Sequence, residues 1–397
     1  MFNYSDKHME FVHTNRLAHV PWAKLAKDFN KKFKCDQSSD ALRLAYSRHK
    51  ELLEAGLPEV DVALLRQARS SAKTSAKNRK ALNLALDAID LQESILERMQ
   101  AVVDKSDIKP IKKPAKSSKK KPTKAKMVME VLLSDLHYGK LTDDFHLAEA
   151  RARMRKYSAA VVNQYEMQTA LGYNISSIDL AFLGDIIESA TMHGVESLKS
   201  CEFGNSEQVT AAIDSIFHDF IVPVAQTGAK LKALCVTGNH SRVMPQKTFI
   251  KPGKEHLSWI IYNTLEMLCK KTEIDISFQI AEGPTLVHTI FTDTVLYEHY
   301  DLVNTCTKKG FLDMLAKRQS QLGQIIDFYR GGHWHELTIF DRGRIIVNGC
   351  LPGADGYSES LGFSTESVQA INFYCRNQTR PNSYYYTFPV YLGGGDE

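Results

Sequence analysis

The sequence has few of the features that mark membrane or secreted proteins. Its 397 residues contain no apolar run long enough to cross a bilayer, and no signal-peptide pattern follows Met1. The seven cysteines are odd in number, scattered, and never spaced as Cys-x-x-Cys, which argues against a disulfide framework and against a zinc ribbon. We therefore expect a cytoplasmic protein that does not contact membranes.

The charge of the chain is divided unevenly along its length. Residues 1–126 hold 27 Lys and Arg against 15 Asp and Glu, whereas the remainder holds 23 against 31, although the formal net charge is only +4. A basic N-terminal region joined to an acidic body indicates that this region attracts a polyanion, with nucleic acid as the first candidate. The alternative is that surplus lysine only keeps the region soluble.

Residues 1–60 are predicted to form a small helical domain. Pro21 suits a first helical turn, and Ser38 and Ser39 offer an N-cap for a second helix. The apolar residues after Pro21 recur at helical spacing and are Trp22, Leu25, Ala26, Phe29 and Phe33. The pattern resembles a helix-turn-helix or Myb-like module, whose basic second helix enters the major groove of DNA. The candidate DNA-binding residues are Arg43, Arg48 and Lys50. A helical protein-docking domain is the alternative.

Two segments connect this domain to the rest of the chain. Residues 61–103 read as a helical connector, amphipathic from about Ala76 to Val103. This helix could form a coiled-coil homodimer, but Gln92 at a core position favours docking against its own domain. Residues 104–126 hold ten lysines and three prolines with almost no apolar residues, which predicts a flexible linker. Its lysines could track phosphates, or it could be only a solvated tether.

Residues 127–397 alternate short β-rich runs with longer helical stretches. Three runs of buried-strand type end in polar residues, and they are MVMEVLLSD, SSIDLAFLGD and LKALCVTGNH. Open α/β sheets gather their ligand sites at such strand ends. Later runs predict a second sheet, and the segment after Gly349, with Tyr384, Tyr385 and Tyr386, is expected to close it. We predict an α/β (α+β) fold, a four-layer αββα sandwich with its site on loops at one edge.

Polar residues at these strand ends form the candidate site. In chain order they are Asp135, His137, Asp185, Glu188, Asn239, His240, His299, His333 and His335. Imidazole, carboxylate and amide groups suit divalent metals, and two ions about 3.5–4 Å apart need a carboxylate that bridges them. Asp185 is the natural bridge. Each piece is weak alone, but five short elements in this order, each after a strand, are hard to explain by packing.

The segment from Val131 to His335 resembles the calcineurin-like metallophosphoesterases. That superfamily carries DxH, GDxx(D/E), GNH, a lone His and GHxH, and all five occur here in the same order. Its fold is the αββα sandwich. The lack of GDxVDRG and the N-terminal region make the chain look most like double-strand-break-repair nucleases and phage-encoded relatives. The resemblance implies the cytoplasm of a bacterium or of a phage-infected host.

The resemblance also implies a role for each residue. One metal would be held by Asp135, His137, Asp185 and His335, and the other by Asp185, Asn239, His299 and His333. His240 would assist the leaving oxygen and Glu188 would orient its imidazole, with a surface position for Glu188 as the alternative. A hydroxide held between the ions would attack phosphorus in line. The nuclease resemblance favours Mn²⁺, and the mixed ligand set also suits Fe²⁺, Zn²⁺ or Ni²⁺.

One departure from the family pattern follows GNH. Many relatives continue with an acidic residue, but this chain has Ser241 and then Arg242. Arg242 could clamp a substrate phosphate or pair with a surface acid. The nearby segment from Ser189 to Ser206 is expected to form a loop over the cleft and to supply no ligand.

These observations predict a two-metal phosphodiesterase, first of all a DNA nuclease recruited by its basic N-terminal region. A phosphatase or small-nucleotide phosphodiesterase with an N-terminal docking domain is the alternative. A DNA-binding factor with a regulatory metal domain is a second one. Repair nucleases of this type often work with an ATPase, but the sequence identifies no such partner.

Overall fold

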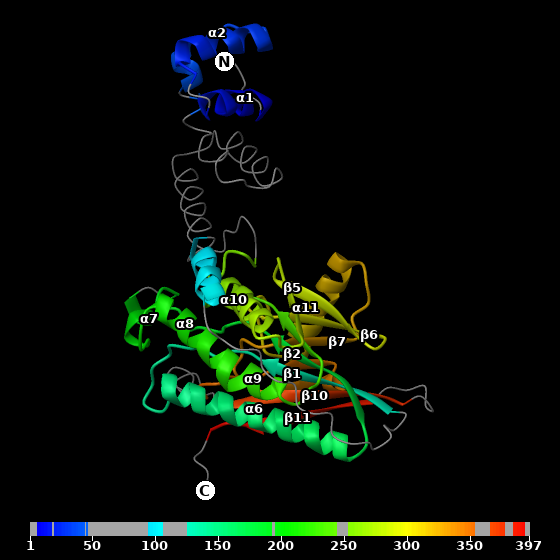
Figure 1. Cartoon of the computed structure of the whole chain (residues 1–397). Coiled ribbons are helices and arrows are strands. Elements are labelled where there is room, and N and C mark those ends of the chain that lie inside the picture. The colour runs from blue at the N-terminus through cyan, green and yellow to red at the C-terminus, as the bar shows by residue number, and fades with distance from the viewer. Residues whose placement is uncertain are drawn as a thin grey trace. The chain divides into compact units, whose positions relative to one another are not determined.

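The structure, a computed structural model, describes most of the chain as two separate units (Figure 1). Its contacts divide the chain into Met1–Leu84 and Ala85–Glu397, called below the N-terminal unit and the C-terminal unit. The described residues are 6–17, 20–43, 45–46, 94–105, 125–192, 195–243, 253–353, 366–377 and 384–393. The predicted linker at residues 104–126 lies almost entirely outside them. Among the described helices, none combines the length and apolar character needed to cross a bilayer.

The N-terminal unit is helical where it is described. It contains α1 (Asp6–Leu17), α2 (Trp22–Phe33) and a further helical stretch at residues 39–43 and 45–46. The fully buried core residues are Met9, Val12, Leu25, Phe29 and Leu42. Ser38 caps the last stretch as expected, because its Oγ accepts a hydrogen bond from the backbone N–H of Ala41 at 3.1 Å. Leu25 and Phe29 belong to this core, so the apolar residues that recur after Pro21 form the packed face of α2.

A six-stranded sheet forms the first half of the C-terminal unit. Its order is β11-β10-β1-β2-β3-β4. The strands are β1 (Ala125–Leu133), β2 (Asn174–Phe182), β3 (Leu231–Cys235), β4 (Ile276–Ile280), β10 (Val368–Asn377) and β11 (Tyr384–Tyr391). Strands β1 to β4 are parallel, and β10 and β11 are antiparallel to their neighbours. The carboxyl ends of β1, β2 and β3 therefore lie at one edge of the sheet.

Helices cover one face of this sheet and bury its largest apolar cluster (Figure 1). They are α6 (Leu147–Ala170), α8 (Asn205–Ser215), the π-helix η1 (Ile216–Ile221), α9 (Val222–Ala225) and α10 (Leu257–Lys271), with the short α7 (Val195–Lys199) between strands. The strand residues that face them alternate along the chain, as in β1, where Met127, Met129, Val131 and Leu133 are all buried.

A five-stranded sheet packs on the other face. Its order is β5-β6-β7-β9-β8. It consists of β5 (Thr285–Ile290), β6 (Asp293–Glu298), β7 (Phe328–Gly331), β8 (Thr338–Phe340) and β9 (Ile345–Val347), with the 3₁₀ turn η2 (Asp341–Gly343). One apolar cluster lies between the two sheets, and another lies between the second sheet and α11 (Lys308–Leu322). The predicted αββα sandwich is confirmed.

The prediction that the segment after Gly349 closes the second sheet is wrong. Strand β10 instead pairs antiparallel with β1, and β11 pairs with β10 at the end of the first sheet. The physical reason is two-sided burial: Phe373 packs under the helices while Tyr374 packs between the sheets. Tyr386 stacks on Phe373 with ring centroids 4.7 Å apart, and the side chains of Tyr384 and Tyr385 lie outside the described residues.

The end of the connector docks on the C-terminal unit. Residues 94–105 are helical, and Ile95, Leu96 and Met99 pack against the main apolar cluster. The hydroxyl of Thr264 on α10 donates to the Met99 sulfur at 3.3 Å. The connector thus packs against its own domain, as favoured, although Gln92 lies outside the described residues.

A buried ion pair joins the two sheets. Glu130 on β1 and Arg330 on β7 are both fully buried and 3.1 Å apart. The carboxylate also accepts hydrogen bonds from Tyr297, Asn372 and Tyr374. Each buried charge is therefore compensated by its partner, and removing one partner would destabilise the fold because it leaves the other charge unpaired.

We expect Arg330→Met to lower the free energy of unfolding by about 3–5 kcal/mol, because it leaves a buried carboxylate without its counter-charge. The double variant Glu130→Gln/Arg330→Met should recover part of this loss. Urea denaturation of both variants measures the difference. A single variant as stable as the wild-type chain would show that the pair does not hold the sheets together.

Candidate metal centre

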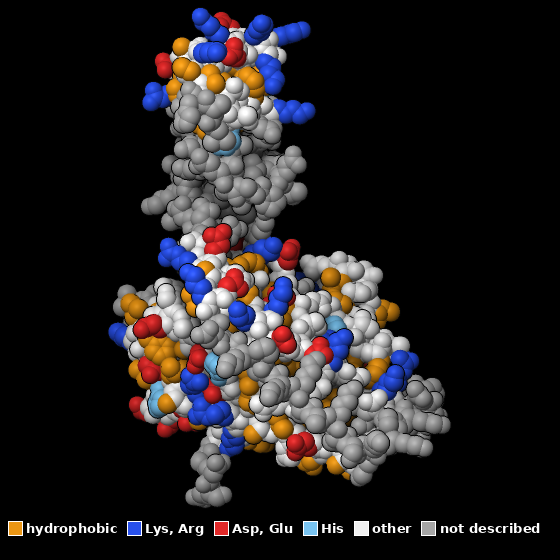
Figure 2. Space-filling model, viewed as in Figure 1, with side chains coloured by type: hydrophobic (Ala, Val, Ile, Leu, Met, Phe, Trp, Pro, Cys, Tyr) orange, Lys and Arg blue, Asp and Glu red, His pale blue; other side chains and the backbone are white. Residues whose placement is uncertain are grey.

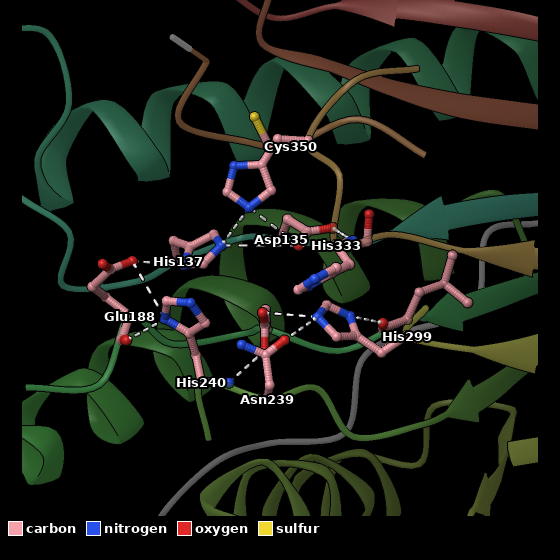
Figure 3. Close-up of polar contacts among 12 residues, drawn as sticks. Asp135, His137, Glu188, Asn239, His240, His299, His333 and Cys350 are labelled. Atoms are coloured by element: carbon pink, nitrogen blue, oxygen red, sulfur yellow. Dashed lines mark hydrogen bonds and ion pairs between the residues drawn. The ribbon is translucent and has the colours of Figure 1, made fainter. Parts of the chain in front are cut away.

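Loops after five strands place the predicted residues at one edge of the sandwich. Asp135 and His137 follow β1, Asp185 and Glu188 follow β2, and Asn239 and His240 follow β3. His299 follows β6, and His333 and His335 follow β7. Figure 3 shows the labelled site residues, such as His137, His240 and His299, turned toward one another from these separate loops. The two sheets thus contribute to one site.

The first group of side chains contains Asp135, His137 and His335. Their ligand atoms all lie within 4.8 Å of one another. The Nε2 atoms of the two histidines are 3.1 Å apart, and Nε2 of His335 lies 3.4 Å from Oδ1 of Asp135. Two imidazole nitrogens that face each other and a carboxylate oxygen match the donors that divalent transition metals take.

The second group contains Asp185, His299 and His333, again within 4.8 Å. Nε2 of His299 lies 2.8 Å from Oδ2 of Asp185 and 3.0 Å from Oδ1 of Asn239. Nδ1 of His299 donates to the carbonyl oxygen of Leu183 at 2.8 Å, because a carbonyl can only accept. A neutral His299 would present only a lone pair to these two oxygens, so a proton on Nε2 or a shared cation must lie between them.

The charges of the site are consistent with bound cations. Burial alone would raise the pKa of Asp185, but the imidazoles of His299 and His240 lower it well below its ordinary value. Burial would likewise raise the pKa of Asp135, but the adjacent His335 lowers it. Burial would lower the pKa of His299, but Asp185 raises it to about 10. The carboxyls of Asp135 and Asp185 are thus ionised at neutral pH, and the histidines beside them supply the compensating positive charge.

The backbone around these residues is strained. Five of the predicted ligands have positive φ values, a left-handed conformation that costs non-glycine residues on the order of 1–3 kcal/mol each. They are Asp135 (52°), His137 (47°), Asp185 (48°), His333 (75°) and His335 (59°). Strain that recurs at the ligand positions of separate loops marks a site whose geometry is set by function rather than by packing.

Close packing explains two glycines of the motifs. A Cβ on Gly238 would lie 2.1 Å from Oδ1 of Asp185, and a Cβ on Gly332 would lie 2.1 Å from Oδ2 of Asp135. The following residues hold the same carboxylates: the backbone N–H of His240 donates to Asp185 at 2.8 Å, and that of His333 donates to Asp135 at 2.9 Å. Each glycine lets a loop approach close enough to fix a carboxylate from the other strand.

Glu188 has a different partner from the predicted one. Its Oε2 lies 2.6 Å from Nδ1 of His137 but 3.9 Å from Nδ1 of His240. Nδ1 of His240 instead donates to the backbone carbonyl oxygen of Glu188 at 2.6 Å. In this geometry the carboxylate contacts His137 more closely than His240, whose Nδ1 is held by the main chain, and the role of Glu188 in orienting His240 stays a prediction. Glu188 is also only 7% exposed, which excludes the surface alternative.

Arg242 pairs with an acid beside the site. Its Nη2 lies 2.6 Å from Oδ2 of Asp301, two residues after His299 in the chain, and both side chains are mostly buried. This geometry favours the ion-pair interpretation over a phosphate clamp, although the acid is not a surface one. Of the residues predicted to bind DNA, Arg43 is exposed on the helical stretch of the N-terminal unit, whereas Arg48 and Lys50 lie outside the described residues.

The segment from Ser189 to Ser206 is partly helical rather than a simple loop. It contains α7, and its two ends are tied down by the backbone N–H of Ser189, which donates to Gln208, and that of Ala190, which donates to Asn205. None of its described residues belongs to a group of possible metal ligands. His193 lies outside the described residues.

Sequence patterns did not reveal the polar side chains that hold the end of β1. The side-chain amide of Asn348 donates to Ser134 Oγ at 2.9 Å and to Gln369 at 2.6 Å, and the backbone N–H of Ser134 donates to Gln369 at 3.1 Å. All three residues are buried and Ser134 directly precedes Asp135. A buried Asn and a buried Gln flanking the apolar runs at the C-terminal end are the signal that could have found them.

Comparison with known proteins gives only distant likenesses. No protein-family model and no curated protein matches the sequence. Among solved structures, zinc-bound Vps29 from Entamoeba histolytica is 12% identical over 67% of this chain and 99% of its own, with a TM-score of 0.30. Vacuolar protein sorting 29 from Cryptosporidium parvum is 11% identical over 67% and 98%, with a TM-score of 0.29. A predicted phosphoesterase from Streptococcus pneumoniae is 12% identical over 66% and 98%, with a TM-score of 0.25. Scores of this size assign neither a family nor a function.

We expect Glu188→Gln to weaken Mn²⁺ binding about 10- to 100-fold, because it removes the carboxylate that fixes the ring of His137. The backbone partner of His240 remains in this variant. Isothermal titration of the variant and of the wild-type chain with Mn²⁺ measures the effect. Unchanged metal affinity with slower turnover would return Glu188 to the role of orienting His240.

Proposed function

We propose that this chain is a two-metal phosphodiesterase of the calcineurin-like metallophosphoesterase type and that it acts on DNA as a nuclease. The observation that carries the proposal is the convergence, from five strand ends, of two ligand groups with strained backbones. Only a site selected for its ligands accounts for that combination, because packing alone does not require left-handed histidines and aspartates.

The donor set fits two divalent cations. Asp135, His137 and His335 would hold one ion, and His299, His333 and Asn239 would hold the other, with Asp185 shared between them. Bound ions of this kind stabilise charge on a phosphoryl group and make water nucleophilic near neutral pH. The mixture of imidazole, carboxylate and amide suits Mn²⁺, which we favour, and also suits Fe²⁺, Zn²⁺ or Ni²⁺.

His240 is placed to exchange a proton with the substrate. Because its Nδ1 must donate to the carbonyl of Glu188, Nε2 is the nitrogen that exchanges a proton with the leaving oxygen. The ring lies edge-on to His137 with centroids 4.7 Å apart, and its side chain is 16% exposed. His240 thus stands beside the ligand groups and at the rim, where a leaving group would depart.

The charge of the N-terminal unit supports a DNA substrate. Lys24, Lys27 and Lys31 are all exposed and recur at helical spacing on α2, opposite the buried Leu25 and Phe29. We call these three the α2 lysine row. Figure 2 shows Lys and Arg side chains around the described part of this unit. Residues 127–397 carry an excess of acidic residues, so a basic partner unit would offset their repulsion of a polyanion.

With Mn²⁺, the full-length chain is expected to degrade DNA and to cleave a chromogenic phosphodiester, and EDTA should abolish both activities. Asp185→Asn should lower turnover by more than about 100-fold, because it removes the carboxylate shared by both groups. Asp313→Asn, which changes an exposed carboxylate on α11, is the matched control and should leave turnover unchanged.

The substrate panel separates the competing functions. It should include linear duplex, single-stranded and circular DNA, bis-p-nitrophenyl phosphate and p-nitrophenyl phosphate. Cleavage of the monoester alone would identify a phosphatase. Cleavage of the small diester without DNA would identify a small-molecule phosphodiesterase, and no cleavage at all would refute the proposal.

Lys24→Gln/Lys27→Gln/Lys31→Gln should weaken DNA binding and flatten its salt dependence. Each lost phosphate contact is expected to reduce the slope of log K against log salt by about 0.9. The control is Lys156→Gln/Lys230→Gln/Lys317→Gln, which removes the same charge from exposed positions of the C-terminal unit. Fluorescence anisotropy at several salt concentrations gives the slopes. An unchanged slope in the first variant would exclude the α2 lysine row as a phosphate contact.

A further inference from the structure

A buried hydrogen-bond chain joins the residue after His240 to the first turn of α10. Oγ of Ser241 lies 3.1 Å from Nδ1 of His256 and 2.9 Å from Oγ of Ser258. Ser241 and Ser258 are fully buried, and His256, the N-cap residue of α10, is 4% exposed. Because these three side chains are buried away from solvent, water cannot replace their hydrogen bonds at low cost.

The main chain reinforces the same connection. The backbone N–H of Leu257 donates to the carbonyl oxygen of Ser241 at 2.7 Å, and that of Val243 donates to Glu255 at 3.3 Å. Arg242 and His256 form an antiparallel bridge between these two bonds. The segment that follows His240 is therefore held to the start of α10 by both its backbone and its Ser241 side chain.

The other side of His240 is held by the metal centre. Its backbone N–H donates to Asp185 at 2.8 Å, and its ring donates to the carbonyl of Glu188 at 2.6 Å. The orientation of the His240 ring thus depends on Asp185 and Glu188 on one side and on the position of Ser241 on the other. Where many relatives have an acid after GNH, Ser241 anchors the loop through a neutral group and adds no further charge beside Asp185.

We propose that His256 is a positioning residue, which holds His240 in place through Ser241 for proton exchange with the leaving oxygen. This inference rests on the proposed function. His256 does not belong to any of the groups of possible metal ligands among the described residues, so its effect should fall on the leaving-group step rather than on metal binding. His256 itself touches no reacting atom in this scheme.

The test uses phosphodiesters that differ only in their leaving group. A poor leaving group, such as an alcohol or an unsubstituted phenol, needs a proton as it departs, whereas p-nitrophenolate does not. His256→Ala should therefore lower kcat for the poor leaving groups by about 10- to 100-fold and for p-nitrophenyl esters by less than about 3-fold. KM and Mn²⁺ affinity should stay close to those of the wild-type chain.

Three further variants fix the interpretation. His240→Ala should show the same dependence on the leaving group, with a larger effect. His256→Asn should restore most of kcat, because its amide places a polar atom near the position of Nδ1 and can keep the hydrogen bond to Ser241. His288→Ala is the matched control, since it removes a mostly buried imidazole of β5 that pairs with Asp179, and it should stay within about 3-fold of the wild type.

Three results would overturn the positioning role. Equal losses with all leaving groups in His256→Ala, or loss of bound Mn²⁺, would mean that His256 acts only on the fold. No rescue by His256→Asn in a variant that still binds Mn²⁺ would exclude the route through Ser241. A wild-type chain that cleaves no phosphodiester would refute the proposed function itself, which separates that failure from a failure of this inference.

Discussion

Negative charge buried at the shared edge of two sheets is the constraint on which the rest of the C-terminal unit depends. Asp135, Asp185 and Glu188 are at most 7% exposed, and the pKa of each is lowered. Ionised carboxylates so far from water persist only with hydrogen-bond donors and cations around them. Backbone N–H groups and imidazoles from five loops supply the donors, and the left-handed backbones of these loops follow from bringing the donors within reach.

The sequence predicts the ends of the strands and which side chains come together there, because both depend on local pattern. Asp135, Asp185 and Asn239 each come within a few residues of the end of an apolar run, and parallel strands bring such positions to one edge. What the side chains contact is not local. The backbone carbonyl of Glu188 meets Nδ1 of His240 at 2.6 Å while its carboxylate stays 3.9 Å away, and which of the two makes the contact depends on the conformation of the turn after Asp185.

Long-range pairing limits the prediction of the fold in a similar way. The apolar residues of β10 face both ways, a pattern that suits an inner strand of either sheet, and only its partner β1 decides between them. The apolar face of α2 is predictable from spacing, but its exposed lysines gain meaning only once α1 is seen to cover the opposite face. The amide side chains of Asn348 and Gln369 come from the far end of the chain, where no motif points to them.

The contacts between the connector helix and α10 show in which direction the two helices run relative to each other. Met99 meets Thr264, and the backbone carbonyl of Asp104 accepts from Lys271, so both residue numbers rise together and the two helices run the same way. Residue 94 therefore lies toward the end of α10 that begins beside Ser241, and residue 105 lies toward the opposite end. The first described turn of the connector helix thus lies toward the candidate-site end of α10, and the helix then runs away from that end.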